Sequence, residues 1–351
     1  MTTAPKNAAT GANLPGLLAT VAALLAPGRG ILAADESLGT IGKRFAALGI
    51  PATEENRLAY RGLLFTTPGL QEFITGVILF DETIRQRLGD LAVPEGLVRG
   101  GLIPGIKVDA GTVALPGFSP EKITEGLDGL RERLASYRDC GARFTKWRAV
   151  VAVGEGLPSA VAIAANARAL ARFAALSQEA GLVPIVEPEV LMDGAHGLDR
   201  GEEVAGETLR AVFAALADQR VVLEGMLLKT AMVLPGRDCP EQVAAETAAE
   251  ATLRCLRRNV PAAVPGIVFL SGGQTDVAAT GRLNAICRPG GAPWQLCFSF
   301  GRALQDEAMK IWSGSRGNVP RAQAALLHRA CCNGLAVRGG YSAAAELAAP
   351  Q

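Results

Sequence analysis

The sequence predicts an α/β protein with a single (β/α)8 TIM barrel, and two observations favour this fold. Eight short apolar or β-branched runs recur along the 351 residues, and their centres lie about 28 to 46 residues apart, the length of one strand-and-helix unit. The intervals between them have helical patterns. Alternating strands and helices imply a parallel sheet, and eight repeats imply closure into a barrel. A doubly wound sheet is the alternative, but no expected strand is followed by a G-x-G-x-x-G turn.

The expected strands are rich in Ile, Val, Leu and Phe and are bounded by turn residues. They lie at residues 30–34, 76–80, 103–108, 143–147, 182–186, 226–228, 266–270 and 296–300. Helices are expected in the intervals, because residues 158–180 place apolar side chains on one helical face and arginines on the opposite one. Residues 201–218 and 241–258 are rich in Ala, Leu, Glu and Arg without an internal proline, which also favours helices.

No linker, charge block or low-complexity tract divides the chain, so we expect one domain over residues 1–351. Residues 1–28 are expected to form an N-terminal helical extension, and residues 317–351 a C-terminal helix and tail. The apolar stretch 17–25 resembles a signal-peptide core, but only Lys6 precedes it and a strand-like run follows directly. We therefore expect an amphipathic helix there.

Composition excludes several classes of protein. The hydrophobic content of 49% excludes disorder, and we find no 18-residue apolar run of the kind that crosses a membrane. The net charge of +1 gives no overall field for nucleic acid or an anionic membrane. Seven cysteines form no C-x-x-C pair, which favours reduced thiols in the cytosol. Two histidines cannot make a three-histidine zinc site, so we expect no metal.

Ionisable and small polar residues stand where the expected strands end. Catalysis in this fold takes place at the carboxyl ends of the strands, and six of the eight ends carry an ionisable group. In chain order the residues at these ends are Asp35, Lys107, Lys146, Arg148, Glu187, Glu189, Lys229, Ser271, Gly301 and Arg302. A structural ion pair is the alternative for any one of them, but it does not explain the whole set.

Lys229 is the most informative residue, because it follows the apolar run 225–228 and precedes another, 230–233. Desolvation of its ammonium is costly, which favours the neutral amine, a nucleophile for carbonyls. Repulsion from nearby Lys146 and Arg148 would act in the same direction. A lysine that reaches out to water is the alternative for a lone residue. The two carboxylates of Glu187 and Glu189 would supply the acid and base that amine–carbonyl chemistry requires.

Two sets of residues at the ends of the strands are typical of phosphate sites. Ser271-Gly272-Gly273 follows the seventh strand and Gly301-Arg302 the eighth, the recurrent phosphate site of such barrels. At the opposite rim, a second phosphate would be held by Ser37, Thr40, Lys43, Arg44 and Lys107. Two phosphate sites on either side of an amine nucleophile indicate a bisphosphorylated keto sugar.

These segments resemble class I fructose-bisphosphate aldolase, the Schiff-base type, from about residue 15 to about residue 341. The motifs that carry the resemblance are GILAADES at 30–37, IPGIKVDAG at 103–111, FTKWRAV at 144–150, GLVPIVEPEVLMDG at 181–194, LEGMLLKT at 223–230, VPGIVFLSGGQ at 264–274 and PWQLCFSFGRALQ at 293–305. The resemblance implies reversible, metal-independent cleavage of fructose 1,6-bisphosphate in glycolysis and gluconeogenesis, with no cofactor. It also implies a homotetramer in the cytosol or a plastid.

The resemblance implies a role for each site residue. Lys229 would attack the C2 ketone, Glu187 would transfer protons during carbinolamine formation and dehydration, and Glu189 would support it. Asp35 would take the proton of the C4 hydroxyl, and Lys146 would stabilise charge there. Arg148 would lie near a phosphate. The C1 phosphate would be held by Ser271, Gly272, Gly273, Gly301 and Arg302, and the C6 phosphate by Ser37, Thr40, Arg44 and Lys107.

The chain departs from the family pattern at three places. Lys229-Thr230-Ala231 stands where Lys-Pro-Asn is common, and Thr40 stands where serine is usual. Many members end in a tyrosine that helps to protonate the enamine, whereas this sequence ends in Ala348-Ala349-Pro350-Gln351. We therefore expect proton exchange on dihydroxyacetone phosphate to be slower than in tyrosine-tailed relatives.

Two other functions remain open. A transaldolase-like Schiff-base enzyme would need one phosphate site and would leave Arg44 and Lys107 idle. A binding protein that has lost turnover is supported by the missing tyrosine, but Asp35, Glu187 and Lys229 argue against it. Preference among fructose 1,6-bisphosphate, fructose 1-phosphate and sedoheptulose 1,7-bisphosphate is not readable from the sequence.

Overall fold

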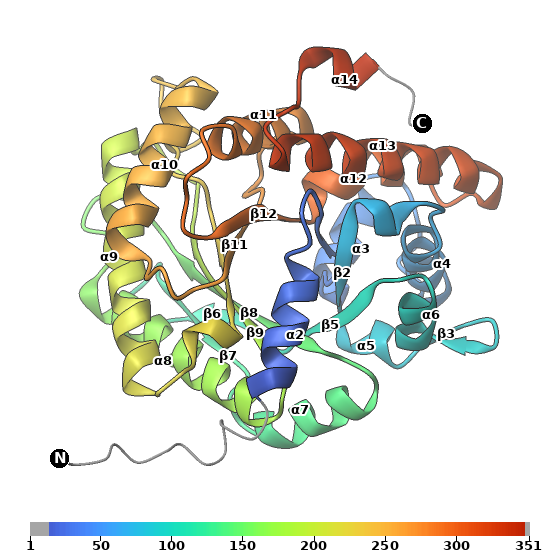
Figure 1. The fold of residues 1–351 in the computed structure, drawn as a ribbon, viewed down its shortest axis with the longest axis horizontal. Coiled ribbons are helices and arrows are strands. Elements are labelled where there is room, and N and C mark those ends of the chain that lie inside the picture. The colour runs from blue at the N-terminus through green and yellow to red at the C-terminus, as the bar shows by residue number, and fades with distance from the viewer. Residues whose placement is uncertain (1–13, 348–351) are drawn as a thin grey trace.

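A closed barrel forms the centre of the molecule, as predicted. The computed structural model describes residues 14–347. In this range eight parallel strands follow one another around the barrel in chain order, and the first pairs with the last to close it (Figure 1). The strands are β1 (Gly30–Ala33), β2 (Ile74–Leu79), β5 (Ile103–Lys107), β8 (Phe144–Val151), β9 (Val183–Val190), β10 (Leu227–Thr230), β11 (Gly266–Phe269) and β12 (Gln295–Phe300).

Helices surround the barrel and bury its outer face. The expected helices at 158–180, 201–218 and 241–258 are confirmed as α8 (Ala160–Glu179), α9 (Leu198–Asp218) and α10 (Ala245–Asn259). The remaining helices are α2 (Leu14–Leu24), α3 (Leu38–Ala46), α4 (Glu54–Phe65), α5 (Asp81–Ile84), α6 (Val93–Arg99), α7 (Leu130–Asp139), α11 (Asp276–Cys287), α12 (Arg302–Trp312), α13 (Val319–Val337) and α14 (Ala343–Leu347), with short 3-10 turns at Leu70–Glu72, Leu223–Gly225 and Arg316–Asn318.

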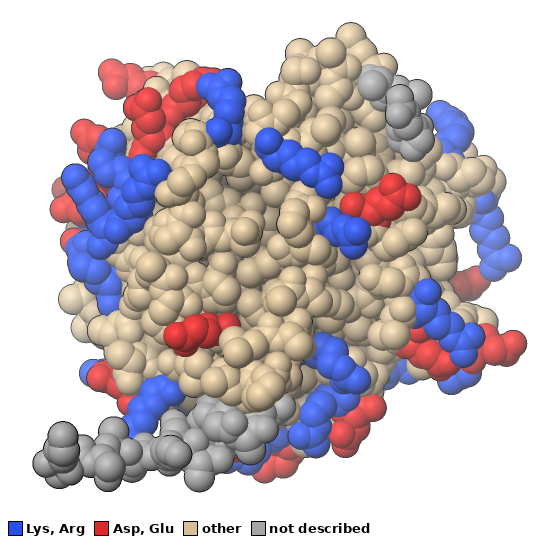
Figure 2. All heavy atoms as spheres, in the orientation of Figure 1, with Lys and Arg blue, Asp and Glu red and all other residues tan. Residues whose placement is uncertain are grey.

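The N-terminal helix α2 covers the amino ends of the strands. Its residues Leu17, Val21 and Leu24 are buried in one cluster with inward-facing residues of the barrel. In Figure 1 this helix crosses the middle of the barrel, and Figure 2 shows that the same face has few charged groups near its centre. The predicted amphipathic helix is thus present. Residues 1–13 of the expected N-terminal extension and residues 348–351 of the expected tail, including Ala348-Ala349-Pro350-Gln351, lie outside the described range.

The barrel interior changes from apolar to charged along the strands. Phe144, Ile185 and Leu227 belong to the buried apolar cluster near the amino ends. Side chains two residues apart on a strand point to the same side. The same inward-facing rows therefore continue into Lys146, Glu187 and Lys229 towards the carboxyl ends. The candidate site therefore lies at the carboxyl ends of the strands, where the inward-facing side chains are charged.

Two strand predictions were too short. β8 and β9 end at Val151 and Val190, four residues beyond the predicted ends, and they stay paired in register over their whole length. Charged residues in these segments have the sequence pattern of strand ends. The ladder continues past them because their charges find partners inside the barrel. Two hairpins were not predicted: β3 (Arg87–Leu88) with β4 (Leu91–Ala92), and β6 (Gly111–Ala114) with β7 (Lys122–Glu125).

The expectation that no segment could cross a membrane needs correction. Helix α8 is long and apolar enough to do so by length and composition, and 56% of its apolar window is buried within the fold. Its alanine-rich face is buried against the barrel, with Leu170 and Phe173 fully covered. Such a pattern is typical of a core helix, because a helix enclosed between a sheet and its neighbours is apolar on most sides.

We predict that Gly105→Ala destabilises the barrel. A Cβ atom at Gly105 would overlap the ring of Phe144, which is fully buried in the interior. Overpacking of this kind costs about 1–3 kcal/mol, so the midpoint of thermal unfolding should fall. Gly281→Ala is the matched control, because Gly281 lies within α11 and an added Cβ there would have no neighbouring atom within 4 Å. It should gain about 0.5–1 kcal/mol. Equal midpoints for the two variants would contradict this account of the interior.

Candidate active site

A cavity of about 970 Å³ opens at the carboxyl ends of the strands. It is the place where the predicted site residues meet, although they come from segments far apart in the sequence. Of those residues, Asp35, Ser37, Thr40, Arg44, Lys107, Lys146, Arg148, Glu187, Glu189, Lys229, Ser271, Gly272, Gly301 and Arg302 line the cavity. Gly273 does not line it, but its backbone lies beside Arg302, whose guanidinium would be 3.3 Å from a Cβ at this position.

Strand register brings the charged residues together. Lys107 of β5 is in register with Lys146 of β8, and Arg148 of β8 with Glu187 of β9. These residues face the interior, so cations and carboxylates of neighbouring strands are stacked in adjacent layers. Lys229 enters the same region from β10, which pairs with β9. The predicted pairing of Lys146 with Arg148 and of Glu187 with Glu189 on one face agrees with this arrangement.

Four ionisable groups form a chain of alternating charge across the cavity floor. Lys146 Nζ lies 2.6 Å from Asp35 Oδ2 and 3.3 Å from Glu187 Oε2, and Glu187 Oε1 lies 3.0 Å from Lys229 Nζ. Glu187, Lys146 and Lys229 are only 3–4% exposed. Isolated buried charges would be strongly destabilising, so each group depends on its neighbours in this chain. We call these four residues the charge chain.

The charge chain keeps its carboxylates ionised. Burial alone would raise the pKa of Asp35, but the ammonium groups of Lys146 and Lys229 outweigh it and lower that pKa from 3.8 to about 2. Burial would likewise raise the pKa of Glu187, and Lys146, Lys229 and Arg148 lower it below its usual value. For Lys146, burial favours the neutral amine, but Asp35 and Glu187 hold the pKa above the ordinary lysine range. Lys146 is therefore a permanent cation between two carboxylates.

The predicted carboxylates and cations both lie near the Lys229 amine. Glu187 contacts this amine directly. This contact places a carboxylate within proton-transfer distance of the Lys229 amine. The other oxygen, Glu187 Oε2, is buried and lies 3.3 Å from Lys146 Nζ, but it accepts no hydrogen bond among the described residues. A lone pair of Glu187 is thus available to a bound hydroxyl group.

One end of the cavity has the features of an anion site. Gly272 and Gly273 have φ values of +57° and +87°, which L side chains rarely adopt, so the turn after β11 needs glycine. Gly301 caps the N-terminus of α12, and Arg302 is its first residue. A helix N-terminus and an arginine next to exposed backbone N–H groups favour a phosphate.

The second predicted phosphate set is not opposite the first, because β1 pairs with β12 and Arg44 of α3 contacts Asp306 of α12. Ser37 caps helix α3 and accepts a hydrogen bond from the backbone N–H of Thr40, so the start of this helix borders the cavity. However, Arg44 already pairs with Glu36 and with Asp306, the latter at 2.8 Å. Lys107 pairs with Asp109 at 2.5 Å. A phosphate bound here would therefore share Arg44 and Lys107 with the carboxylates that already pair with them.

Several cavity residues were missed by sequence reasoning, and three of them contact or neighbour the predicted site residues. Glu36 binds Arg44. Asp109 binds Lys107 and also accepts a hydrogen bond from the backbone N–H of Arg148 at 3.2 Å. Ser299 lines the cavity from β12, and its buried hydroxyl has no partner in the described range. Asp109 follows Lys107 by two residues and Ser299 precedes Gly301 by two, so strand alternation was a usable signal for both. Glu36 carried no comparable signal.

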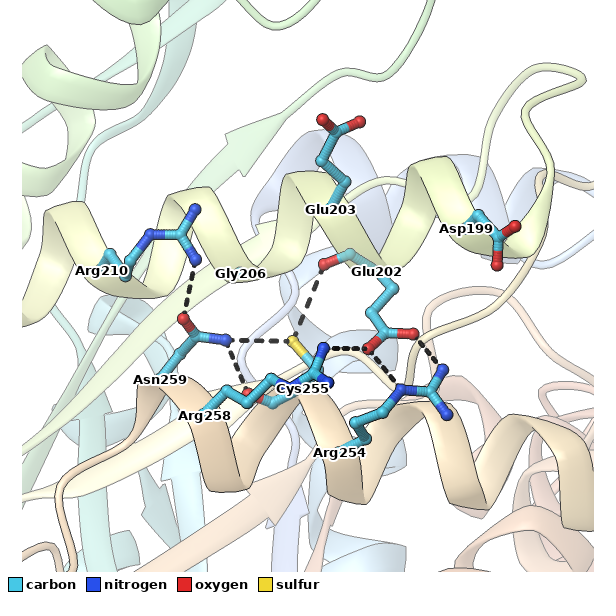
Figure 3. A pocket seen from close by; sticks show the side chains of 9 residues that line it. All are labelled: Asp199, Glu202, Glu203, Gly206, Arg210, Arg254, Cys255, Arg258 and Asn259. Carbon is cyan, nitrogen blue, oxygen red and sulfur yellow. Dashed lines mark hydrogen bonds and ion pairs between the residues drawn. The ribbon is translucent and has the colours of Figure 1, made fainter.

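Other polar clusters do not offer the same chemistry. A hollow of about 340 Å³ lies between α9 and α10. Figure 3 shows the residues that line it, in which Glu202 pairs with Arg254 and Arg210 donates to Asn259. Its charged groups largely satisfy one another. His328, Cys332 and Glu346 lie close enough to share a metal ion, but Glu346 is held at both oxygens by Arg329. Neither place contains a buried lysine beside a carboxylate.

Comparisons with known proteins agree with this geometry. A sequence model of the family "Fructose-bisphosphate aldolase class-I" matches residues 16–351. A Xanthomonas axonopodis pv. citri protein named "Probable fructose-bisphosphate aldolase class 1" is 55% identical, over 93% of this chain and 98% of the relative. "Fructose-bisphosphate aldolase 4, cytosolic" of Arabidopsis thaliana is 52% identical, over 94% and 85%. The solved structure of the Plasmodium falciparum aldolase, in complex with TRAP and an inhibitor, superposes with a TM-score of 0.93, 45% identity and coverage of 97% and 98%.

We predict that Lys146→Met is destabilising, most strongly at neutral pH. Loss of this cation leaves Asp35 and Glu187 buried without their shared partner, which costs about 3–5 kcal/mol. In the intact protein the lowered pKa of Asp35 stabilises the fold fully above pH 3.8, and this contribution is lost as the pH falls through about 2. Without Lys146 burial raises that pKa, so protonation of Asp35 in acid relieves the buried charge. The loss of stability relative to the unmodified protein should therefore shrink as the pH falls.

Denaturant unfolding at several pH values measures this effect. Lys310→Met is the control, because Lys310 is 64% exposed and 3.9 Å from Glu307, and its loss should change stability by less than about 1 kcal/mol. Equal free energies of unfolding for Lys146→Met and the unmodified protein at neutral pH would show that the charge chain does not stabilise the barrel mouth.

Proposed function

The chain belongs to the class I fructose-bisphosphate aldolase family, and we propose that its charge chain carries out the Schiff-base cleavage of fructose 1,6-bisphosphate. The family relationship makes it a metal-independent aldehyde-lyase of glycolysis. The contact between Lys229 Nζ and Glu187 Oε1 at 3.0 Å is the observation that carries the proposal. It joins a buried amine to a carboxylate that can relay its proton.

In the first stage Lys229 forms the imine. Glu187 takes a proton from the Lys229 ammonium, and the free amine attacks the C2 carbonyl carbon, so that a C–N bond forms. The C=O π electrons move to the oxygen, which takes up the proton that the attacking nitrogen loses and becomes the carbinolamine hydroxyl. Glu187 then returns a proton to this hydroxyl, which leaves as water and gives the protonated imine. Glu189, which binds Arg148 at 2.5 Å, supports Glu187 by engaging a neighbouring cation.

In the second stage Asp35 promotes cleavage of the C3–C4 bond. Its carboxylate removes the C4 hydroxyl proton, the C4–O bond becomes a carbonyl, and the electron pair of the C3–C4 bond moves into the protonated imine. Glyceraldehyde 3-phosphate leaves, and an enamine remains on Lys229. Lys146, 2.6 Å from Asp35, stabilises the negative charge that develops on the C4 oxygen. Protonation of the enamine and hydrolysis of the imine release dihydroxyacetone phosphate.

The two ends of the cavity suit the two phosphates. The positive-φ turn at Gly272-Gly273, Ser271, Gly301 and Arg302 support binding of the C1 phosphate near Lys229. Ser37 and Thr40 at the start of α3, with Arg44 and Lys107, support binding of the C6 phosphate. Arg148, which pairs with Glu189, also lines the cavity and adds a further cation. A transaldolase-like function would leave one of these ends unused.

We also propose a homotetramer in the cytoplasm. The support is the family, whose relatives include cytosolic and chloroplastic proteins. Light scattering should then give about four times the chain mass of 36.4 kDa. A mass equal to one chain at micromolar concentration would contradict the proposal.

We predict that Lys229→Met abolishes cleavage. Removal of the nucleophile should lower kcat by about 10⁴-fold or more, measured with fructose 1,6-bisphosphate and a coupled assay for the triose products in the presence of EDTA. Lys122→Met is the control, because Lys122 is exposed on β7 and does not line the cavity. Turnover by Lys229→Met close to that of the control, or loss of all activity in EDTA, would exclude this mechanism.

A further inference from the structure

Asp35 lies in a short irregular segment whose position is not set by the sheet. β1 ends at Ala33, and α3 begins at Leu38. The last ladder-like contact is the hydrogen bond from the backbone N–H of Ala34 to the carbonyl of Ile78, at 3.0 Å. Beyond it the peptide carbonyls need other donors, because buried backbone groups are rarely left unpaired. Side chains from the surrounding helices supply them.

Arg61 of α4 binds the peptide groups on both sides of Asp35. Its guanidinium donates to the carbonyl of Ala34, and at 3.3 Å to the carbonyl of Glu36. It also donates to Glu36 Oε2 at 2.9 Å. The Arg61 side chain is 3% exposed, so these bonds do not compete with water. One rigid planar group therefore fixes the backbone before and after the carboxylate.

Gln305 of α12 extends this arrangement into the core. Its amide donates to the carbonyl of Ala33 at 2.6 Å, and its oxygen accepts from the Tyr60 hydroxyl at 2.9 Å. Tyr60 neighbours Arg61 in α4 and packs on Phe45 and Trp312, with ring centres 5.8 and 5.4 Å away. Burial raises the pKa of Tyr60 well above its usual range, so it remains a hydrogen-bond donor. The support of Asp35 is thus anchored in packed aromatic residues.

We propose that Arg61 is a positioning residue for Asp35 in the cleavage step, an inference that rests on the proposed function above. Lys146 holds one oxygen of Asp35, but a single contact does not fix where the other oxygen points. The backbone grip of Arg61 sets that direction towards the C4 hydroxyl. Small displacements of a reacting group can lower the rate by about 10²-fold.

The position of Arg61 makes the expected defect selective. Lys229 and Glu187 lie on β10 and β9, and Arg61 contacts neither of them. Imine formation should therefore be nearly unaffected when Arg61 is replaced, whereas C3–C4 cleavage should be slow. A purely structural role would impair both steps together. Arg61 also binds Glu36, a partner of Arg44, so the test must exclude an effect on the C6 phosphate.

The experiment compares Arg61→Gln and Arg61→Lys with Arg57→Gln. Arg57 is the matched control: it lies one turn earlier on α4 and pairs with Glu82 at 2.5 Å, away from the Asp35 segment. Cleavage is measured as kcat with fructose 1-phosphate, which lacks the C6 phosphate. Imine formation is measured as the rate of borohydride trapping with dihydroxyacetone phosphate, read from the intact protein mass.

We expect Arg61→Gln to lower kcat on the order of 10²-fold while the trapping rate changes less than about threefold. Arg61→Lys should recover part of the loss, and Arg57→Gln should match the unmodified protein in both assays. If Arg61→Gln does not fold, Arg61→Lys carries the test, with slower cleavage and unchanged trapping. Equal losses in both steps, or unchanged cleavage, would overturn the proposal. Absence of trapping in the unmodified protein would instead refute the proposed function.

Discussion

The pairing of Lys146 with two carboxylates is the constraint on which the rest of the site depends. Its ammonium lies between Asp35 and Glu187, and Glu187 in turn binds Lys229. None of the four charges would be stable in the barrel alone, because burial disfavours each of them. Together they fix the ionisation of both carboxylates and the distance between Glu187 and the Lys229 amine. In the proposed mechanism, the contacts that stabilise these buried charges also position Asp35 and Glu187 for their separate proton transfers.

The barrel separates stability from chemistry along its axis. Near the amino ends, α2 and inward-facing apolar residues such as Phe144 and Leu227 fill the interior. Towards the carboxyl ends, the same rows of side chains become Lys146 and Lys229. The charged layer lies directly above a close-packed apolar layer, which leaves no space for the charged side chains to move towards the amino ends of the strands. The outer helices contribute as well, since Arg61 and Gln305 hold the backbone next to Asp35.

Most of the barrel and of the cavity lining could be predicted from the sequence, because both follow from strand periodicity. Lys229 and Glu187 were recognisable in the sequence, because each is an ionisable residue at the end of an apolar run. Partnerships across the fold were not predictable in the same way. The pairing of Arg44 with Asp306, and the grip of Arg61 on the Asp35 segment, join residues far apart in the chain. The lengths of β8 and β9 were also missed, since their charges look like strand ends until their partners are known.

The most direct test of this account is to identify the lysine that forms the imine. The protein is incubated with dihydroxyacetone phosphate, reduced with borohydride in the presence or absence of EDTA, and digested for peptide mass spectrometry. The account predicts one reduced adduct, on the peptide that contains Lys229, with the same yield in both conditions. An adduct on Lys146 or another lysine, or no adduct at all, would contradict the assignment of Lys229 as the nucleophile of the charge chain.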